Sequence, residues 1–173
     1  MSIKKLSSIA MLTALNVVLA LATPVKLINF KFTFEAFPIL VAALLMGPVE
    51  GMLTGLLGSG LYQILFSGYG ITPTTPLWML PHALSGLVVG LLGRRINRGS
   101  IVQVATVAIL SALLVTAFNT LALYVDSKMF GYYSDKLVFG ALALKVAAGI
   151  ILAGIYALIL PGLIARLRPI VEK

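Results

Sequence analysis

The chain has 173 residues, of which 60% are hydrophobic and 10% are charged, and its mean hydropathy is +1.08. A soluble domain carries about 25% charged residues, so this composition excludes an ordinary soluble domain and predicts an integral membrane protein. In such a protein the net charge of +8 is typical of cytoplasmic loops near lipid headgroups, not of nucleic-acid binding.

Six apolar segments follow one another along the chain, and each is predicted to be a membrane helix, because a crossing needs about 20 mostly apolar residues. Their approximate ranges are 6–22, 34–46, 49–66, 77–93, 101–124 and 137–165. The second is short for a crossing, so we expect its start to reach back towards Phe30. The prediction is an all-α integral membrane protein in which residues 1–173 form one domain of six transmembrane helices.

The distribution of lysine and arginine predicts the orientation. Eight of the 13 basic residues lie at the two ends of the chain and between the fourth and fifth helices, and these are Lys4, Lys5, Arg94, Arg95, Arg98, Arg166, Arg168 and Lys173. In a six-helix chain these three regions share one side of the membrane. Both termini are therefore expected to be cytoplasmic, and the longer loops on the outer face are expected to do the binding.

Small residues recur at helical spacing in the first and third segments. Ala10 and Ala14 lie one turn apart, and small residues at this spacing let another helix approach closely. From spacing alone, the first helix could use them either to pack within its own bundle or to dock on a partner. The glycine series of the third segment, at 51, 55, 58 and 60, favours close contact inside the bundle.

Several polar residues are predicted to lie at membrane depth, where an ionisable group normally faces a partner or a wet cavity. Lys145 is placed about two turns into the sixth helix, and Glu35 at a similar depth in the second could pair with it. The alternative for Lys145 is that its side chain reaches the interface. Asn119 and Gln63 are each candidates for a site or for a simple hydrogen bond between helices.

The only tryptophan and the only histidine, Trp78 and His82, are four residues apart and so share a helix face. A tryptophan there could belong to the interfacial aromatic belt. The histidine and the loop tyrosines Tyr69, Tyr132 and Tyr133 favour a binding site for a flat heterocyclic ligand instead, since stacking rings and hydrogen-bonding groups stand together.

The chain offers little for catalysis. With one histidine and no cysteine, no zinc site of the usual type can be assembled, and no phosphate-binding glycine loop is present. We therefore expect no enzyme activity, no cofactor and no metal. Glu35, His82 and Lys145 leave room for an autonomous proton-coupled small-molecule carrier, and a scaffold protein without a ligand is a third hypothesis.

At this point the whole pattern resembles a known family, the substrate-binding S components of energy-coupling factor (ECF) transporters. The stretch "SSIAMLTALNVVLA" is similar to the family's first helix, and "FTFEAFPILVAALLMGPVEGMLTGLLGSGLYQILF" to its second and third around a Gly-Pro turn. The stretch "LWMLPHALSGLVVGLLGRR" is similar to the fourth helix and its basic exit. The resemblance covers essentially the entire chain.

The resemblance implies a function and a set of sites. The chain would capture a water-soluble vitamin at the outer face of a bacterial cell membrane. A transmembrane coupling subunit and two cytosolic ATPases would then drive its import as parts of an ABC importer. Ala10 and Ala14 match the docking motif for the coupling subunit. The residues at ligand-binding places are Lys31, Tyr69, Trp78, His82, Asn119 and Lys145, and Glu35 is added as a hydrogen-bonding group.

The vitamin is left open. The overall pattern is closest to the folate-type branch, but "TPTTPLW" precedes the fourth helix where that branch has a "PGFT"-like stretch, and Ser59 stands where it has an acidic residue. Pantothenate would suit Lys145 as a carboxylate partner. Hydroxymethylpyrimidine or pyridoxine would suit Trp78 as a stacking ring with His82 and Glu35 as hydrogen-bonding groups.

Overall fold

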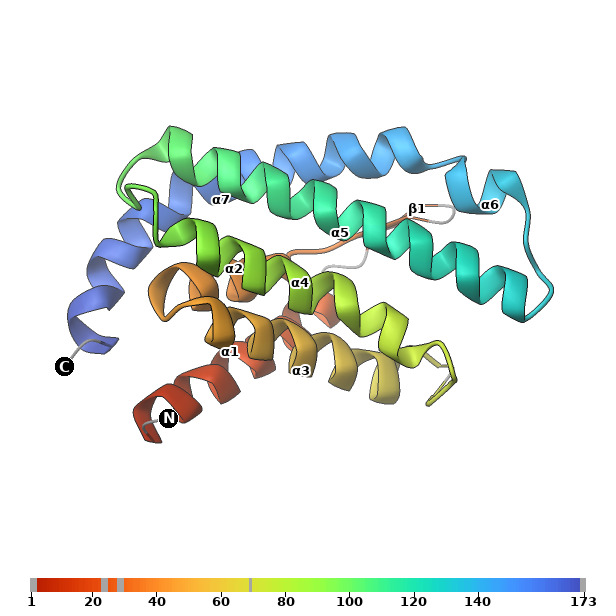
Figure 1. The fold of residues 1–173 in the computed structure, drawn as a ribbon, viewed down its shortest axis with the longest axis horizontal. Helices are drawn as coiled ribbons and strands as arrows, with labels where there is room; N and C mark the ends of the chain where they lie inside the picture. Colours follow the sequence, from red (N-terminus) through yellow and green to blue (C-terminus); the bar gives the residue numbers. More distant parts are fainter. Residues whose placement is uncertain (1–2, 23–24, 28–29, 69, 172–173) are drawn as a thin grey trace.

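The computed structural model describes residues 3–22, 25–27, 30–68 and 70–171, which form helices and one short hairpin (Figure 1). The elements are α1 (Ile3–Ala22), β1 (Val25–Leu27), β2 (Phe30–Phe32), α2 (Ala36–Leu45), α3 (Pro48–Phe66), α4 (Thr75–Gly93), α5 (Ile101–Met129), α6 (Asp135–Phe139) and α7 (Leu142–Val171). The all-α fold class is confirmed.

The six predicted helices correspond to α1, α2, α3, α4, α5 and the α6–α7 pair, with several differences. The second begins at Ala36 and does not reach back towards Phe30, because Phe30 lies in strand β2. The fifth continues to Met129, beyond the expected end at residue 124. The sixth is interrupted at residues 140–141, so Lys145 lies in the first turn of α7 and not two turns inside a helix. Residues 25–32 contain an antiparallel hairpin in which Val25 pairs with Phe32, and alternation over three residues is too short to predict it.

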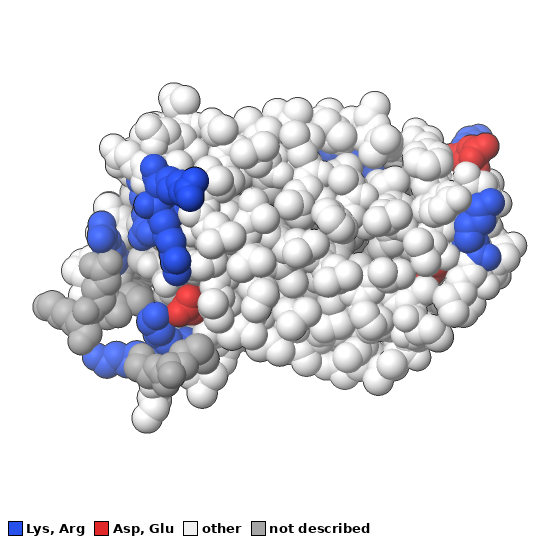
Figure 2. Space-filling model, in the orientation of Figure 1, with Lys and Arg blue, Asp and Glu red and all other residues white. Residues whose placement is uncertain are grey.

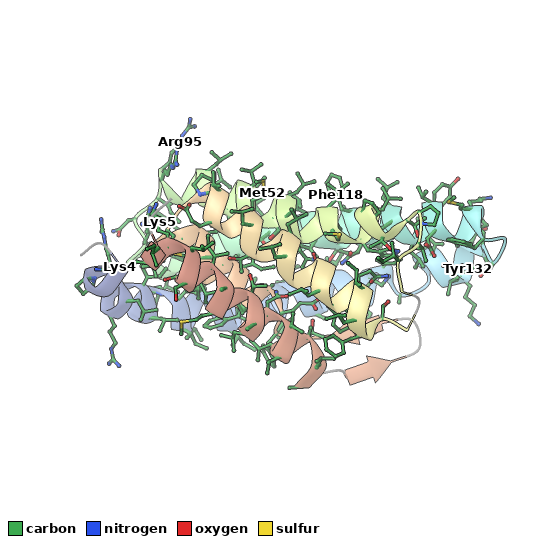
Figure 3. The ribbon with its side chains drawn as sticks, turned by 90° about the horizontal axis from the view of Figure 1, so that it is seen from below. Lys4, Lys5, Met52, Arg95, Phe118 and Tyr132 are labelled. Atoms are coloured by element: carbon green, nitrogen blue, oxygen red, sulfur yellow. The ribbon has the colours of Figure 1, made fainter. Side chains whose placement is uncertain are left out.

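The helices form a bundle with two distinct ends. Both chain termini lie at one end, here called the terminal end, and residues 130–134 lie at the opposite, distal end (Figure 1). Lys4, Lys5 and Arg95 are at the terminal end, while Tyr132 is at the distal end (Figure 3). Figure 2 shows an almost uncharged surface between two charged ends: basic side chains predominate at one end, beside an acidic group, and basic and acidic side chains lie together at the other.

Four stretches of the described chain are long and apolar enough to cross a membrane, and they are Ile3–Ala22, Thr75–Gly93, Ile101–Met129 and Asp135–Pro169. Exposed large hydrophobic side chains cover their outer faces, for example Met11 on α1 at 71% exposure and Leu158 on α7 at 70%. Such surfaces are stable in lipid and not in water. The protein is a membrane protein.

Helix α2 is short and is the most deeply buried helix in the described part of the chain. Residues 38 to 45 are all buried, as expected for a helix that is apolar on every side. Its ten residues span about 15 Å, roughly half the hydrocarbon thickness of a bilayer. Because it ends at the terminal end beside Gly47, whose φ of +130° suits the turn into α3, it leaves the distal half of the interior unfilled.

The glycines of α3 bring three other elements close to its backbone, as the sequence predicted. A Cβ atom at residue 51 would lie 2.6 Å from the Cβ of Ala43 in α2, and at residue 55 it would overlap the backbone of His82 in α4. At residue 58 it would overlap the side chain of Asn16 in α1. These close approaches position the residues described next.

Candidate ligand-binding cavity

A cavity of about 460 Å³ lies in the distal half of the bundle, next to the start of α2. Its walls come from α3, α4, α5 and α7, and Ala36 and Leu40 of α2 close it towards the terminal end. Apolar surface makes up most of the wall, and each of these four helices adds two or three residues with polar groups. This size and composition are typical of a small-molecule site, in which a few placed polar groups provide selectivity.

One wall holds a contact between two ionisable residues. The Nε2 atom of His82 lies 3.3 Å from Oε1 of Glu35, the residue that precedes α2. The close approach of α3 at Gly55 positions the α4 backbone at His82. Pro81 lies inside α4, and its missing N–H removes one helical hydrogen bond next to His82.

Two residues of the cavity lining each carry a buried polar atom that has no hydrogen-bond partner among the described residues. They are Nδ1 of His82, whose residue is 8% exposed, and the hydroxyl of Tyr156, whose residue is 4% exposed. Because Nε2 faces a carboxylate and therefore carries the proton, a neutral His82 ring presents Nδ1 as an acceptor. Buried polar atoms are normally satisfied, so both atoms are suited to hydrogen bonding with a ligand.

The other polar residues around the cavity come from the remaining walls. Trp78 contributes from the same helix as His82, Asn119 from α5 and Lys145 from α7. Each of the three is half-buried, so each reaches the cavity while part of it stays accessible. A ring that can stack, an amide and an ammonium are thereby available to one small molecule.

The cavity brings together five of the seven binding residues expected from the sequence: Glu35, Trp78, His82, Asn119 and Lys145. Tyr69 lies outside the described residues. Lys31 belongs to β2, where it pairs with Lys26 of β1, and its side chain lies outside the described part. Within the described part of the chain Glu35 contacts His82, and no ion pair joins it to Lys145, the partner that the sequence suggested.

Two of the loop tyrosines expected at the binding site, Tyr132 and Tyr133, lie at the distal rim and do not line the cavity. Tyr132 donates a hydrogen bond to Asp126, which also accepts one from Thr74, and this connects the ends of α4 and α5. Tyr133 donates to Asp135, which raises the pKa of its phenol, and the Lys128 ammonium lies 3.8 Å from the centre of its ring. These contacts support the rim instead of covering a ligand.

Sequence reasoning missed several lining residues, and Tyr156 is the most informative. It lies deep in an apolar run of α7, where its ring contacts Phe34 and Phe37 and the residue lines the cavity. A tyrosine far from either membrane interface is itself unusual, and that signal could have identified it. Ser59, Tyr62, Ser111 and Thr116 also line the cavity, but short polar residues in helices give no comparable signal.

The two alanines expected to dock a partner lie on the exposed face of α1. Ala10 and Ala14 are exposed, whereas the opposite face, which includes Thr13 and Asn16, is buried in the bundle. Packing within this chain, the alternative interpretation of their spacing, therefore does not use them. Their face is smooth enough for another helix to approach closely.

The chain matches the model of a known family. The model of the family described as "ECF transporter, substrate-specific component" matches residues 4–166 of the chain. No curated protein sequence matches it significantly.

Proposed function

Since a match over residues 4–166 shows that this chain belongs to the substrate-specific components of ECF transporters, we propose that it is the high-affinity binding subunit of a vitamin importer. The cavity of about 460 Å³ is the main support for this proposal, because five of the residues expected from the sequence to bind a ligand line it. The ligand is a water-soluble vitamin or precursor. The candidates are folate-like compounds, pantothenate, hydroxymethylpyrimidine and pyridoxine.

The proposed mechanism is capture followed by handover, without covalent chemistry. The ligand enters from the distal side, stacks on Trp78 and replaces water around His82, Asn119 and Lys145. Hydrogen bonds made in this low-dielectric space give selectivity, because an analogue that leaves a buried polar group unpaired is rejected. The chain itself is not an enzyme in this proposal, and partner ATPases supply the energy.

The proposed setting is a bacterial plasma membrane, with both termini and the terminal end in the cytoplasm. The basic residues at that end support this orientation. A transmembrane coupling subunit contacts the exposed face of α1 at Ala10 and Ala14, and two cytosolic ATPases act through that subunit. The ligand would then be released on the cytoplasmic side.

The direct test is mass spectrometry of small molecules released when the detergent-solubilised protein is denatured, with Trp78→Ala as the matched variant. A stoichiometric vitamin in the wild type that is depleted in the variant supports the proposal and identifies the ligand. If the wild type is empty, Trp78 fluorescence is titrated with each candidate vitamin. No response to any of them contradicts the binding function.

The buried contact between Glu35 and His82 favours one alternative, an autonomous proton-coupled carrier, because such a pair can exchange a proton. That function predicts uptake or efflux by liposomes containing this chain alone, driven by a proton gradient and abolished by Glu35→Gln. A subunit that depends on partner ATPases shows no such transport. If the chain were instead a scaffold without a ligand, Trp78→Ala and His82→Ala would leave its function intact.

A further inference from the structure

The ammonium of Lys145 is placed where a cation is unfavourable. Lys145 is half-buried and lines the cavity. It lies in the first turn of α7, which contains no acidic residue. The positive end of the helix dipole repels a cation at this position and attracts an anion. A half-buried charge in such a place normally has a counter-charge.

The protein does not supply that counter-charge among its described residues. The side chain of Lys145 has neither an ion pair nor a hydrogen bond in that part of the chain. Glu35 is the only described carboxylate that lines the cavity, and it lies beside His82. The positive charge of Lys145 is therefore left facing the cavity.

The second observation comes from the far side of the same cavity. Nδ1 of His82 and the hydroxyl of Tyr156 are buried and unpartnered within the described residues. Lys145 and Tyr156 are separated along α7 by roughly 16 Å, at about 1.5 Å per residue. A ligand that pairs with Lys145 and also hydrogen-bonds to His82 and Tyr156 must be elongated, with an anionic group at one end and a hydrogen-bonding group at the other.

We propose that the ligand of this cavity is a small organic acid whose carboxylate pairs with Lys145 and whose other end hydrogen-bonds to His82 and Tyr156. A carboxylate fits better than a phosphate, because Lys145 is the only lysine or arginine in the described lining and phosphate sites usually employ several donors or an arginine. This inference rests on the proposed function and narrows its substrates to the acidic vitamins.

The test uses purified full-length protein and a panel of compounds, with Trp78 fluorescence as the readout. The carboxylates are pantothenate, folate, biotin and nicotinate. Panthenol and nicotinamide are the uncharged counterparts of pantothenate and nicotinate. Pyridoxine, hydroxymethylpyrimidine and thiamine represent other compounds without a carboxylate, and pyridoxal 5′-phosphate represents phosphates. We expect a carboxylate to bind, and its uncharged counterpart, panthenol for pantothenate for example, to bind at least tenfold more weakly.

Variants at Lys145 distinguish the effect of losing the positive charge on binding from an effect on folding. Lys145→Met should weaken binding of the acid at least tenfold and leave the weak binding of the uncharged counterpart unchanged, whereas Lys145→Arg should retain most of the affinity. In the absence of ligand, Lys145→Met should raise the Tm in detergent, because it removes an uncompensated charge. A destabilised Lys145→Met protein would contradict the claim that this charge lacks a partner.

Failure of this inference can be distinguished from failure of the proposed function. Tight binding of an uncharged or cationic compound, unaffected by Lys145→Met, would overturn this inference and leave the vitamin-binding function standing. Binding of pyridoxal 5′-phosphate in preference to every carboxylate would overturn the choice of anion. Failure of all compounds to bind would contradict the proposed function itself.

Discussion

The side-chain amide of Asn16 donates a hydrogen bond of 2.5 Å to the backbone carbonyl of Glu35. Asn16 is 2% exposed on the buried face of α1, and its side chain packs against Gly58 of α3. Glu35 in turn contacts His82 in the cavity. One hydrogen bond therefore joins the helix that carries Ala10 and Ala14 to the turn that carries a cavity carboxylate.

Replacing Asn16 should affect stability and binding together. Asn16→Ala leaves the Glu35 carbonyl without its donor, and we expect a loss of about 1–3 kcal/mol in unfolding free energy. Because the Glu35 turn then loses its anchor, ligand affinity should also fall. Thermal unfolding in detergent and Trp78 fluorescence titration measure the two effects. Met11→Ala on the exposed face of α1 is the control, and equal effects of both variants would contradict the assigned role of the hydrogen bond.

Contact between α3 and α4 should depend on glycine at residue 86. A Cβ atom there would overlap the backbone of Gly51, so Gly86→Ala must separate the two helices, at a cost of about 1–3 kcal/mol. Gly154→Ala on α7 is the matched control, since nothing lies within 4 Å of its added Cβ. The Tm of each purified variant in detergent tests this. A normal Tm for Gly86→Ala would show that α3 and α4 are farther apart than described.

Trp78 should contribute to affinity through its ring. Trp78→Ala is expected to weaken ligand binding by roughly ten- to a hundredfold, because it removes a large stacking surface. Trp78→Phe keeps an aromatic face and should lose much less. Isothermal titration calorimetry is suitable, since neither variant retains tryptophan fluorescence. Similar losses in both variants would indicate that the indole N–H, and not stacking, carries the contribution.

Enlarging Ala14 should separate binding from transport. Ala14 is exposed on α1 and lines no part of the cavity, so Ala14→Trp should leave ligand affinity within about a factor of two of the wild type. Uptake in cells that contain the coupling subunit and ATPases should be abolished, because a bulky side chain prevents close helix approach. Leu158→Trp, an equally bulky change on exposed α7, is the control. Uptake that survives Ala14→Trp would exclude this docking face.

The sequence by itself determined the class of the protein and most of its helices. Long apolar runs bounded by glycine, proline and basic residues are local patterns, and the hydrophobic thickness of a membrane requires them. The glycines at 51, 55 and 58 predicted close packing for the same reason, since their spacing along one helix face is visible without the fold. The choice of Trp78 and His82 as one group likewise followed from helical spacing.

Only the tertiary structure decided where the cavity is and which groups share it. The cavity exists because α2 is about half the length of a membrane crossing and its neighbours continue past it. The sequence indicated a short second segment, but not the space that this segment leaves in the bundle. The partner of Glu35 proved to be His82 and not Lys145, because contacts between helices depend on which turns lie at the same depth. Tyr156 entered the site for that reason as well, since its position along α7 brings its hydroxyl to the level of the Glu35 turn. Periodicity determines the face of a helix that a residue occupies, but only the packed bundle determines what that face meets.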